Sequence, residues 1–160
     1  MNSPQEPCHP LTLRIPPLAL LAIIGTATWL GARAVAPLNF EYGARRWLTA
    51  CLVALGFISS LWGVASFRRA RTTVDPMHPH AATALVVSGI YGFTRNPMYL
   101  GFLFFLLGEI AWLANPVALI GAPVFVLYLN RFQIAPEESA LTQRFGAEFT
   151  HYASRVPRWL

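Results

Sequence analysis

Two polar runs lie against strongly apolar stretches, and they hold the residues of this sequence that could do chemistry. The first run, 85–101, is rich in turn residues and contains two tyrosines and an asparagine. The second, 130–138, contains Arg131 and the adjacent acids Glu137 and Glu138. A guanidinium can hold a carboxylate through two hydrogen bonds, and a carboxylate can accept a proton from a reacting group. Backbone groups in the first run need partners other than lipid, so we expect this run to bind a soluble ligand.

The residues at the edges of these runs indicate where helices begin. Gly89 follows a serine and can adopt a positive φ, which favours a turn. Asn96 followed by Pro97 predicts a helix start, with Asn96 as the N-cap and Pro97 at the first helical position. Pro136 predicts a second start, and the two acids after it suit the positive end of a helix dipole.

The composition predicts an all-α integral membrane protein with a single domain over 1–160. Hydrophobic residues make up 55% of the chain, its mean hydropathy is +0.47, and the apolar residues occur in blocks. Such blocks are typical of membrane spans. A signal peptide cleaved near Ala34 and Ala36 is an alternative for the first block. We expect four transmembrane helices and then an amphipathic cytoplasmic helix, over residues 16–36, 47–67, 97–113, 117–133 and 137–152.

The connections between the spans place the two polar runs together. Asn115 and Pro116 predict a tight turn, so the third and fourth spans form an antiparallel hairpin that returns the chain to the first run. The arginine cluster at 68–71 predicts a cytoplasmic loop by the positive-inside rule, although Arg45 and Arg46 then lie on the opposite side. We therefore expect a multi-pass protein of a bacterial inner membrane, with both termini and the polar runs facing the cytoplasm.

Charge and cysteine content argue against several other classes of function. The net charge is +5, and all twelve basic residues are arginine. Without an aromatic and basic nucleic-acid motif, this charge favours contact with lipid headgroups over RNA or DNA. Cys8 and Cys51 do not indicate a disulfide framework. The four histidines lack zinc-site spacing, and His78 and His80 are separated by a proline, so no metal site is expected.

Several motifs together resemble the isoprenylcysteine carboxyl methyltransferase family, in its bacterial branch, and the related phospholipid N-methyltransferases. They are Leu-Val-x-Ser-Gly-Ile-Tyr, Arg-Asn-Pro-Met-Tyr-Leu-Gly, Glu-Glu-x-x-Leu-x-x-x-Phe-Gly-x-x-Phe-x-x-Tyr and a terminal Arg-Val-Pro, within residues 68–160. The resemblance implies S-adenosylmethionine (SAM) bound by the C-terminal half, about 76–160, without a Rossmann domain. It also implies a lipidic or prenylated acceptor among the membrane lipids.

The family's functional residues carry over onto both polar runs. Relatives have His at the position of Thr83. Animal enzymes have a substrate-contacting Arg at the position of Gln133, so Arg131, two residues earlier, is the candidate to take over the contact with the substrate. An amine acceptor would lose a proton first, and Glu138 is the nearest candidate base, whereas a carboxylate acceptor needs none. The expected cofactor contacts are Thr83, Ala84, Leu85, Val86, Gly89, Tyr91, Asn96, Pro97, Met98, Tyr99 and Glu137.

The same residues and motifs permit other interpretations. The function expected is SAM-dependent carboxyl O-methylation of a prenylcysteine-like acceptor. The alternatives are N-methylation of a phospholipid or amine, an NADPH-dependent membrane reductase of the sterol-reductase kind, and a non-catalytic membrane protein. Tyr91 and Tyr99 could be interface aromatics. Glu137 could be only a dipole partner. Glu109 lies inside the third span, where an ionisable group suggests function, but it is also close to the turn and is left outside the site.

Overall fold

The computed structural model describes residues 13–38, 42–71 and 83–160, and all regular structure within these ranges is helical. The all-α prediction is confirmed for this part of the chain. His78, His80 and the start of the predicted cofactor-binding half lie outside the described residues. The α-helices are α1 (Pro17–Ala32), α2 (Tyr42–Arg69), α3 (Pro97–Leu113), α4 (Gly121–Leu129), α5 (Ala135–Phe145) and α6 (Ala147–Arg155). Short elements between them are the 3-10 turns η2 (Gly89–Gly92) and η3 (Ala118–Ile120) and the π turn η4 (Asn130–Ile134).

Two stretches of continuous helix, Tyr42–Arg69 and Ala118–Phe145, are long and apolar enough to cross a membrane. The apolar helices α1 and α3 are shorter, with 16 and 17 residues. The third predicted span matches α3 at both ends. Helix α1 ends at Ala32, before the end of the first predicted span, 16–36, and α2 extends beyond the second, 47–67, at both ends. Four complete crossings stay a prediction.

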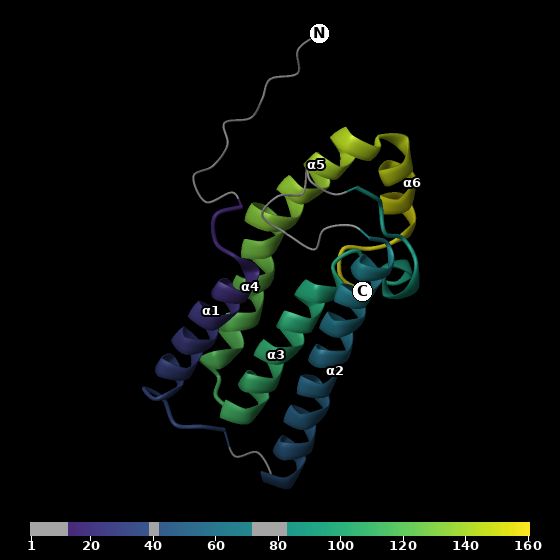
Figure 1. The fold of residues 1–160 in the computed structure, drawn as a ribbon. Helices are drawn as coiled ribbons and strands as arrows, with labels where there is room; N and C mark the ends of the chain where they lie inside the picture. The colour runs from purple at the N-terminus through teal and green to yellow at the C-terminus, as the bar shows by residue number, and fades with distance from the viewer. Residues whose placement is uncertain (1–12, 39–41, 72–82) are drawn as a thin grey trace.

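Helices α2 and α3 lie side by side along the length of the molecule (Figure 1). Glycines at their contact explain how the backbones come so close. A methyl group added at Gly101 would lie 2.1 Å from the Ser60 hydroxyl oxygen and 2.7 Å from the Gly56 carbonyl oxygen. Further along α2, the Ser59 hydroxyl donates a hydrogen bond to the carbonyl of Pro97, the first residue of α3, at 2.6 Å. Small residues at the interface are the usual way for membrane helices to associate.

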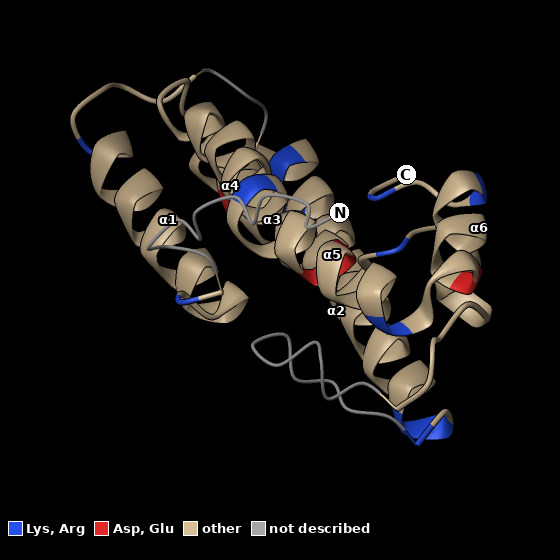
Figure 2. Cartoon of the chain, turned by 90° about the horizontal axis from the view of Figure 1, so that it is seen from above, with Lys and Arg blue, Asp and Glu red and all other residues tan. Residues whose placement is uncertain are grey.

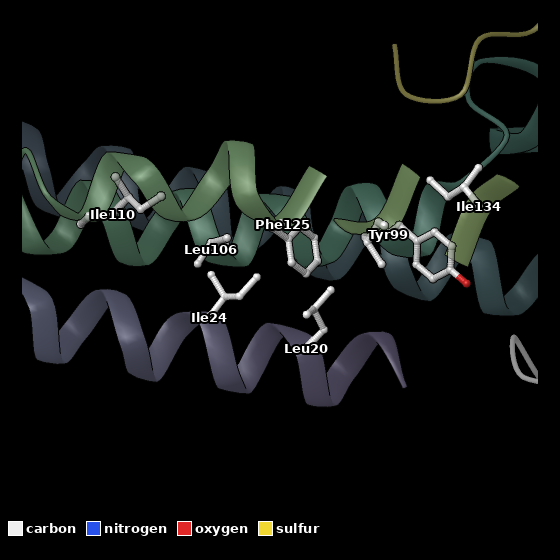
Figure 3. Packing of buried hydrophobic residues seen from close by; sticks show 9 residues of the cluster. Leu20, Ile24, Tyr99, Leu106, Ile110, Phe125 and Ile134 are labelled. Atoms are coloured by element: carbon white, nitrogen blue, oxygen red, sulfur yellow. The ribbon is translucent and has the colours of Figure 1, made fainter. Parts of the chain in front are cut away.

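The main apolar core lies where α1 meets α3 and α4 (Figure 3). Leu20 and Ile24 of α1 point toward Leu106 and Phe125, and the side chains of Leu106 and Phe125 are completely buried. Many other large apolar side chains are exposed, among them Trp47 on α2, which is 76% exposed. A large exposed apolar surface of this kind fits contact with lipid.

The turn between α3 and α4 confirms the predicted hairpin. Ala114 adopts a left-handed conformation with φ 46° and ends α3. The buried side chain of Asn115 then donates to the carbonyls of Ala32 and Val35 at 3.1 and 2.8 Å, and it accepts a hydrogen bond from the Val117 N–H at 2.9 Å. One amide thus satisfies backbone groups from α1 and from the turn, which fixes α1 against the hairpin.

Helix α5 begins at Ala135 with Pro136 in its first turn, within one residue of the predicted start, but the chain is already helical before it. It passes from α4 into α5 through the π turn, in which the Ala135 N–H donates to the carbonyl of Asn130, five residues earlier. Proline lacks an N–H and normally clashes with the preceding helical turn. The wider π turn accommodates it, and the helix continues.

The predicted single amphipathic helix over 137–152 is two helices. Gly146 has φ +54° and ψ −123°, a conformation that side chains disfavour, and it separates α5 from α6. Helix α6 turns back and buries Phe149 and Tyr152, which form a cluster with Val156 and the partly buried Leu85. The end of the chain therefore packs on the first polar run.

We predict that Gly101→Ala destabilises the protein, because the Gly56 carbonyl belongs to the backbone and cannot move aside as a flexible side chain can. The free energy of unfolding should fall by about 1–3 kcal/mol, the usual penalty for overpacking, against a gain in helix propensity of up to about 1 kcal/mol. Thermal unfolding in detergent measures the change. Gly92→Ala is the matched control, since the nearest atom to its added methyl is 4.0 Å away. Equal unfolding temperatures for the two variants would contradict the close packing of α2 and α3.

Candidate functional site

The first turn of α3 distributes its side chains among three neighbours. Pro97 and Met98 lie against α2, where a methyl added at Gly63 would come within 3.3 and 3.0 Å of their side chains. Asn96 points the other way and donates from its amide to the Arg158 carbonyl at 3.0 Å. Tyr99 faces α5. Only one of these four side chains therefore points directly at the second polar run.

Tyr99 and Glu137 join the two polar runs. The Tyr99 hydroxyl donates to the Glu137 Oε1 at 2.5 Å, and the Gln133 amide donates to the same oxygen at 2.5 Å. Tyr99 and Gln133 are 4% and 1% exposed. Burying a carboxylate is unfavourable unless it is hydrogen bonded and paired. Two donors partly compensate here, while among the described residues no cationic side chain forms an ion pair with Glu137.

Glu138, the next residue, has cationic partners. Figure 2 shows acidic positions (red) on α5 and a basic position (blue) beside the C-terminus of the chain. The Arg158 guanidinium donates from Nε and a terminal nitrogen to the two oxygens of Glu138 at 2.9 and 2.6 Å, and Arg95 approaches Oε1 at 3.2 Å. The hydrogen bond to Glu138 raises the pKa of Arg158. The Nε of Arg95 is buried, and it has no partner among the described residues. The adjacent acids therefore differ in their partners: two guanidinium groups pair with Glu138, and none among the described residues pairs with Glu137.

The segment 83–92 lies between the end of α2 and helix α6. Gly89 has φ +66°, which confirms the predicted turn, and a methyl there would lie 3.2 Å from the Trp62 indole nitrogen. The Tyr91 ring packs edge-on against Phe67 with centroids 5.3 Å apart. The Tyr91 carbonyl accepts a hydrogen bond from the Tyr152 hydroxyl at 2.8 Å.

Two tyrosines at this end keep their protons. Burial raises the pKa of Tyr152 to about 12, although nearby Arg95 opposes the change. Burial also raises the pKa of Tyr91 far above its ordinary value, and the charges of Tyr152 and Glu137 add to the effect. Both hydroxyls are therefore donors at neutral pH. Glu137 of the second polar run is thus near enough to Tyr91 to contribute to the rise in its pKa.

The structure brings together some of the predicted site residues and separates others. Tyr99, Gln133 and Glu137 are in direct contact, with Tyr91 close by. Thr83, Ala84, Leu85 and Val86 form the irregular segment before the turn, where Val86 is buried with Tyr91 and Leu85 packs toward α6. Arg131 is exposed on the π turn, and among the described residues no hydrogen bond or ion pair joins it to Glu137.

The prediction that the Asn96 side chain caps α3 is wrong. Asn96 precedes Pro97 as expected, but its side chain forms no cap hydrogen bond because it is engaged by the C-terminal tail. Sequence reasoning also missed Arg95 and Arg158. The terminal Arg-Val-Pro motif ends one residue before Arg158 and was the available signal.

Glu109 lies outside this site. It is ten residues beyond Tyr99 on α3, about 15 Å along the helix axis, in a groove of about 500 Å³ between α1 and α3. Its Oε1 is 3.4 Å from the Thr28 hydroxyl, a long contact, and its Oε2 rests against Gly25. Glu109 is therefore separated along α3 from the contact between Tyr99 and Glu137.

Comparisons with known proteins identify relatives in bacteria, plants and animals. The chain is 46% identical to an uncharacterized protein of Haemophilus influenzae over 63 residues, which cover 39% of this chain and all of that one. It is 32% identical to protein-S-isoprenylcysteine O-methyltransferase B of Arabidopsis thaliana over 106 residues, 66% of this chain and 54% of that one. It is 34% identical to human protein-S-isoprenylcysteine O-methyltransferase over 76 residues, 48% of this chain and 27% of that one.

The chain thus spans about half the length of the Arabidopsis relative and about a quarter of the human one. No solved structure matches it significantly. The family model described as phospholipid methyltransferase matches residues 44–148, which include all but the first two residues of α2, both polar runs and the contact between Tyr99 and Glu137. Because this match covers well over half of the sequence, the chain belongs to the phospholipid methyltransferase family, as its motifs predicted.

Proposed function

We propose that this chain is a single membrane-embedded domain that transfers a methyl group from SAM to a lipidic or lipid-anchored acceptor at the cytoplasmic face. The acceptor we propose is the carboxylate of a prenylcysteine-like group. Support comes from family membership and from relatives that are named protein-S-isoprenylcysteine O-methyltransferases. The apolar helices support a membrane location.

The observation that carries the proposal is the state of Glu137. Its carboxylate is partly buried, receives two neutral hydrogen bonds, and forms no ion pair within the described residues. Such a group favours a cationic ligand. The first polar run also contributes the aromatic rings of Tyr91 and Tyr99, and aromatic rings attract cations. SAM carries an ammonium and a sulfonium, so the residues present fit this cofactor.

In this proposal, Glu137 binds the amino group of the cofactor, while Tyr99 and Gln133 hold the Glu137 side chain in place. The extended segment 83–86 and Tyr91 supply the opposite wall. When bound, SAM supplies a methyl group on a sulfonium, which a nucleophile can accept by in-line displacement. Because a carboxylate is ionised at neutral pH, positioning it supplies most of the rate.

The structure favours an acceptor that needs no base. Glu138 was the candidate base for an amine acceptor, but two guanidinium groups hold its oxygens. Both oxygens are occupied by these guanidinium contacts, so Glu138 is poorly placed to accept a proton from an acceptor amine. We therefore assign Glu138 a structural role, in which its contacts with Arg95 and Arg158 hold the site together. Arg131, exposed on the π turn, is the group we propose to orient an acceptor carboxylate, with Gln133 as its buried neighbour.

A second candidate function is N-methylation of a phospholipid amine, which the name of the matching family favours. Radiolabelled SAM distinguishes the two. We predict that membranes containing the protein, and not membranes lacking it, incorporate label into a lipid or lipid-anchored fraction. Release of that label by mild base would indicate an ester. Label that resists base would indicate an N-methyl product and overturn the carboxylate assignment.

Direct binding tests the donor independently of the acceptor. We expect purified protein to bind SAM and not NADPH. Binding of NADPH alone would favour the reductase alternative, and binding of neither would favour a protein without a cofactor.

We predict that Glu137→Gln weakens SAM binding by about tenfold or more, since a charge-assisted contact is about twice as strong as a neutral one. Glutamine keeps the size and an acceptor oxygen for Tyr99, so helical content should not change. Isothermal titration measures the affinity and circular dichroism the helical content. The control is Glu148→Gln, the same change at an exposed acid on α6. Equal affinities for the two variants would remove Glu137 from the site.

A further inference from the structure

We propose that residues 157–159 form a strap across the candidate site and that Arg158 is a positioning residue for the cofactor. This inference rests on the proposed function, because SAM is the ligand whose binding the strap would support. The strap is the short stretch that follows α6 and turns back over the start of α3 (Figure 1).

Backbone carbonyls of the strap hold the loop that leads into α3. The Pro157 carbonyl accepts a hydrogen bond from the Arg95 N–H at 3.0 Å. The Arg158 carbonyl accepts two more, from the Thr94 hydroxyl and the Asn96 amide, both at 3.0 Å. Thr94 is 1% exposed, so these polar groups would lack partners if the strap left. An unpaired buried donor is costly, and the strap is therefore an integral part of this loop.

Side chains of the strap attach to the other polar run. The Arg158 guanidinium forms its two hydrogen bonds with Glu138, and the Trp159 indole N–H donates to the Asn130 side-chain oxygen at 3.1 Å. Trp159 also packs against the main apolar core. Asn130 is the first residue of the π turn, which carries Gln133, and Glu138 lies in the first turn of α5, next to Glu137. The strap thus contacts the second polar run at both of its ends.

The strap holds the segment that carries Tyr99 at a fixed distance from the segment that carries Glu137. The loop 94–96 is one helical turn before Tyr99, and Glu138 is adjacent to Glu137. Arg158 contacts both segments at once, with its carbonyl on the loop and its guanidinium on α5.

Arg158 also affects the charge of the site. Two neighbouring carboxylates repel each other unless one is neutralised. Arg158 and Arg95 pair with Glu138, which leaves Glu137 as the carboxyl group without a cationic partner among the described side chains. Loss of Arg158 should therefore disturb both the position and the electrostatics of the cofactor contact.

Arg158→Gln and Arg155→Gln form a matched pair for the test. Arg155 is the last residue of α6 and is exposed. We expect Arg158→Gln to weaken SAM binding by about tenfold, within the usual range for coupled sites, while Arg155→Gln leaves the affinity unchanged. The KM for SAM should rise, and the KM for the acceptor and the kcat at saturating SAM should not. Arg158→Lys should recover little, because an ammonium cannot form the two-pronged contact.

Several outcomes would overturn the proposal. Equal SAM affinities for Arg158→Gln and Arg155→Gln would do so. A loss of SAM affinity that is fully explained by a smaller folded fraction of Arg158→Gln would do so as well. A rise in the KM for the acceptor alone would also reject the assignment to the cofactor.

Hydrogen exchange separates failure of the strap from failure of the proposed function. If the unmodified protein binds no SAM, the proposed function fails, and the strap is still measurable. We expect amides 94–100 to exchange faster in Arg158→Gln than in Arg155→Gln. Identical exchange in the two variants would show that Arg158 does not hold the loop and would end the proposal.

Discussion

The contact between Tyr99 and Glu137 is the interaction on which the arrangement of the polar end depends. It joins the first turn of α3 to α5 at the point where an apolar bundle meets its polar end. A partly buried carboxylate needs donors, and the nearest ones come from both arms of the hairpin, Tyr99 and Gln133. Glu137 therefore holds the two polar runs together and, because its charge remains uncompensated by described side chains, also provides the chemistry that we assign to the site.

The irregular segment before α3 needs a similar explanation, since backbone groups at a membrane boundary require partners. Helix α6 and the strap supply them. Tyr152 satisfies the Tyr91 carbonyl, and the carbonyls of residues 157 and 158 satisfy polar groups of the loop 94–96. These contacts explain why the chain continues beyond its long helices. The last two helical turns and the strap cover polar backbone that lipid could not.

The sequence predicted the features that depend on local chemistry. The start of α3 at Pro97, the turn at Gly89 and the hairpin at Asn115 all follow from conformational preferences of single residues, and each is confirmed. The meeting of the two polar runs followed from the hairpin alone. Predictions failed where distant segments decide the outcome. The Asn96 side chain binds a carbonyl 62 residues away, and no local pattern could show that the tail takes it from its cap position.

Pro136 and Gly146 illustrate the same limit from opposite directions. A proline usually marks a helix start, but here a π turn absorbs it and the helix continues. A glycine within an amphipathic pattern is often tolerated, but Gly146 adopts a positive φ and redirects the chain. In both cases the sequence marked the right residue, while packing of α6 against the 83–92 segment and of α4 against the core determined its conformation.

The π turn also explains why the site lies at the end of the apolar core. Along the helix, Phe125, Leu129 and Ile134 are all buried, although the spacing between them is four residues and then five. In a regular α-helix a five-residue step would rotate a side chain by about 140° away from its starting face. The wider turn absorbs the extra residue, so Ile134 stays in the core and Gln133 is buried beside it. Gln133 then lies where it can donate to Glu137 one turn later. A local widening of one helix thereby places a partly buried carboxyl group at the end of an apolar face, on a helix long and apolar enough to cross a membrane.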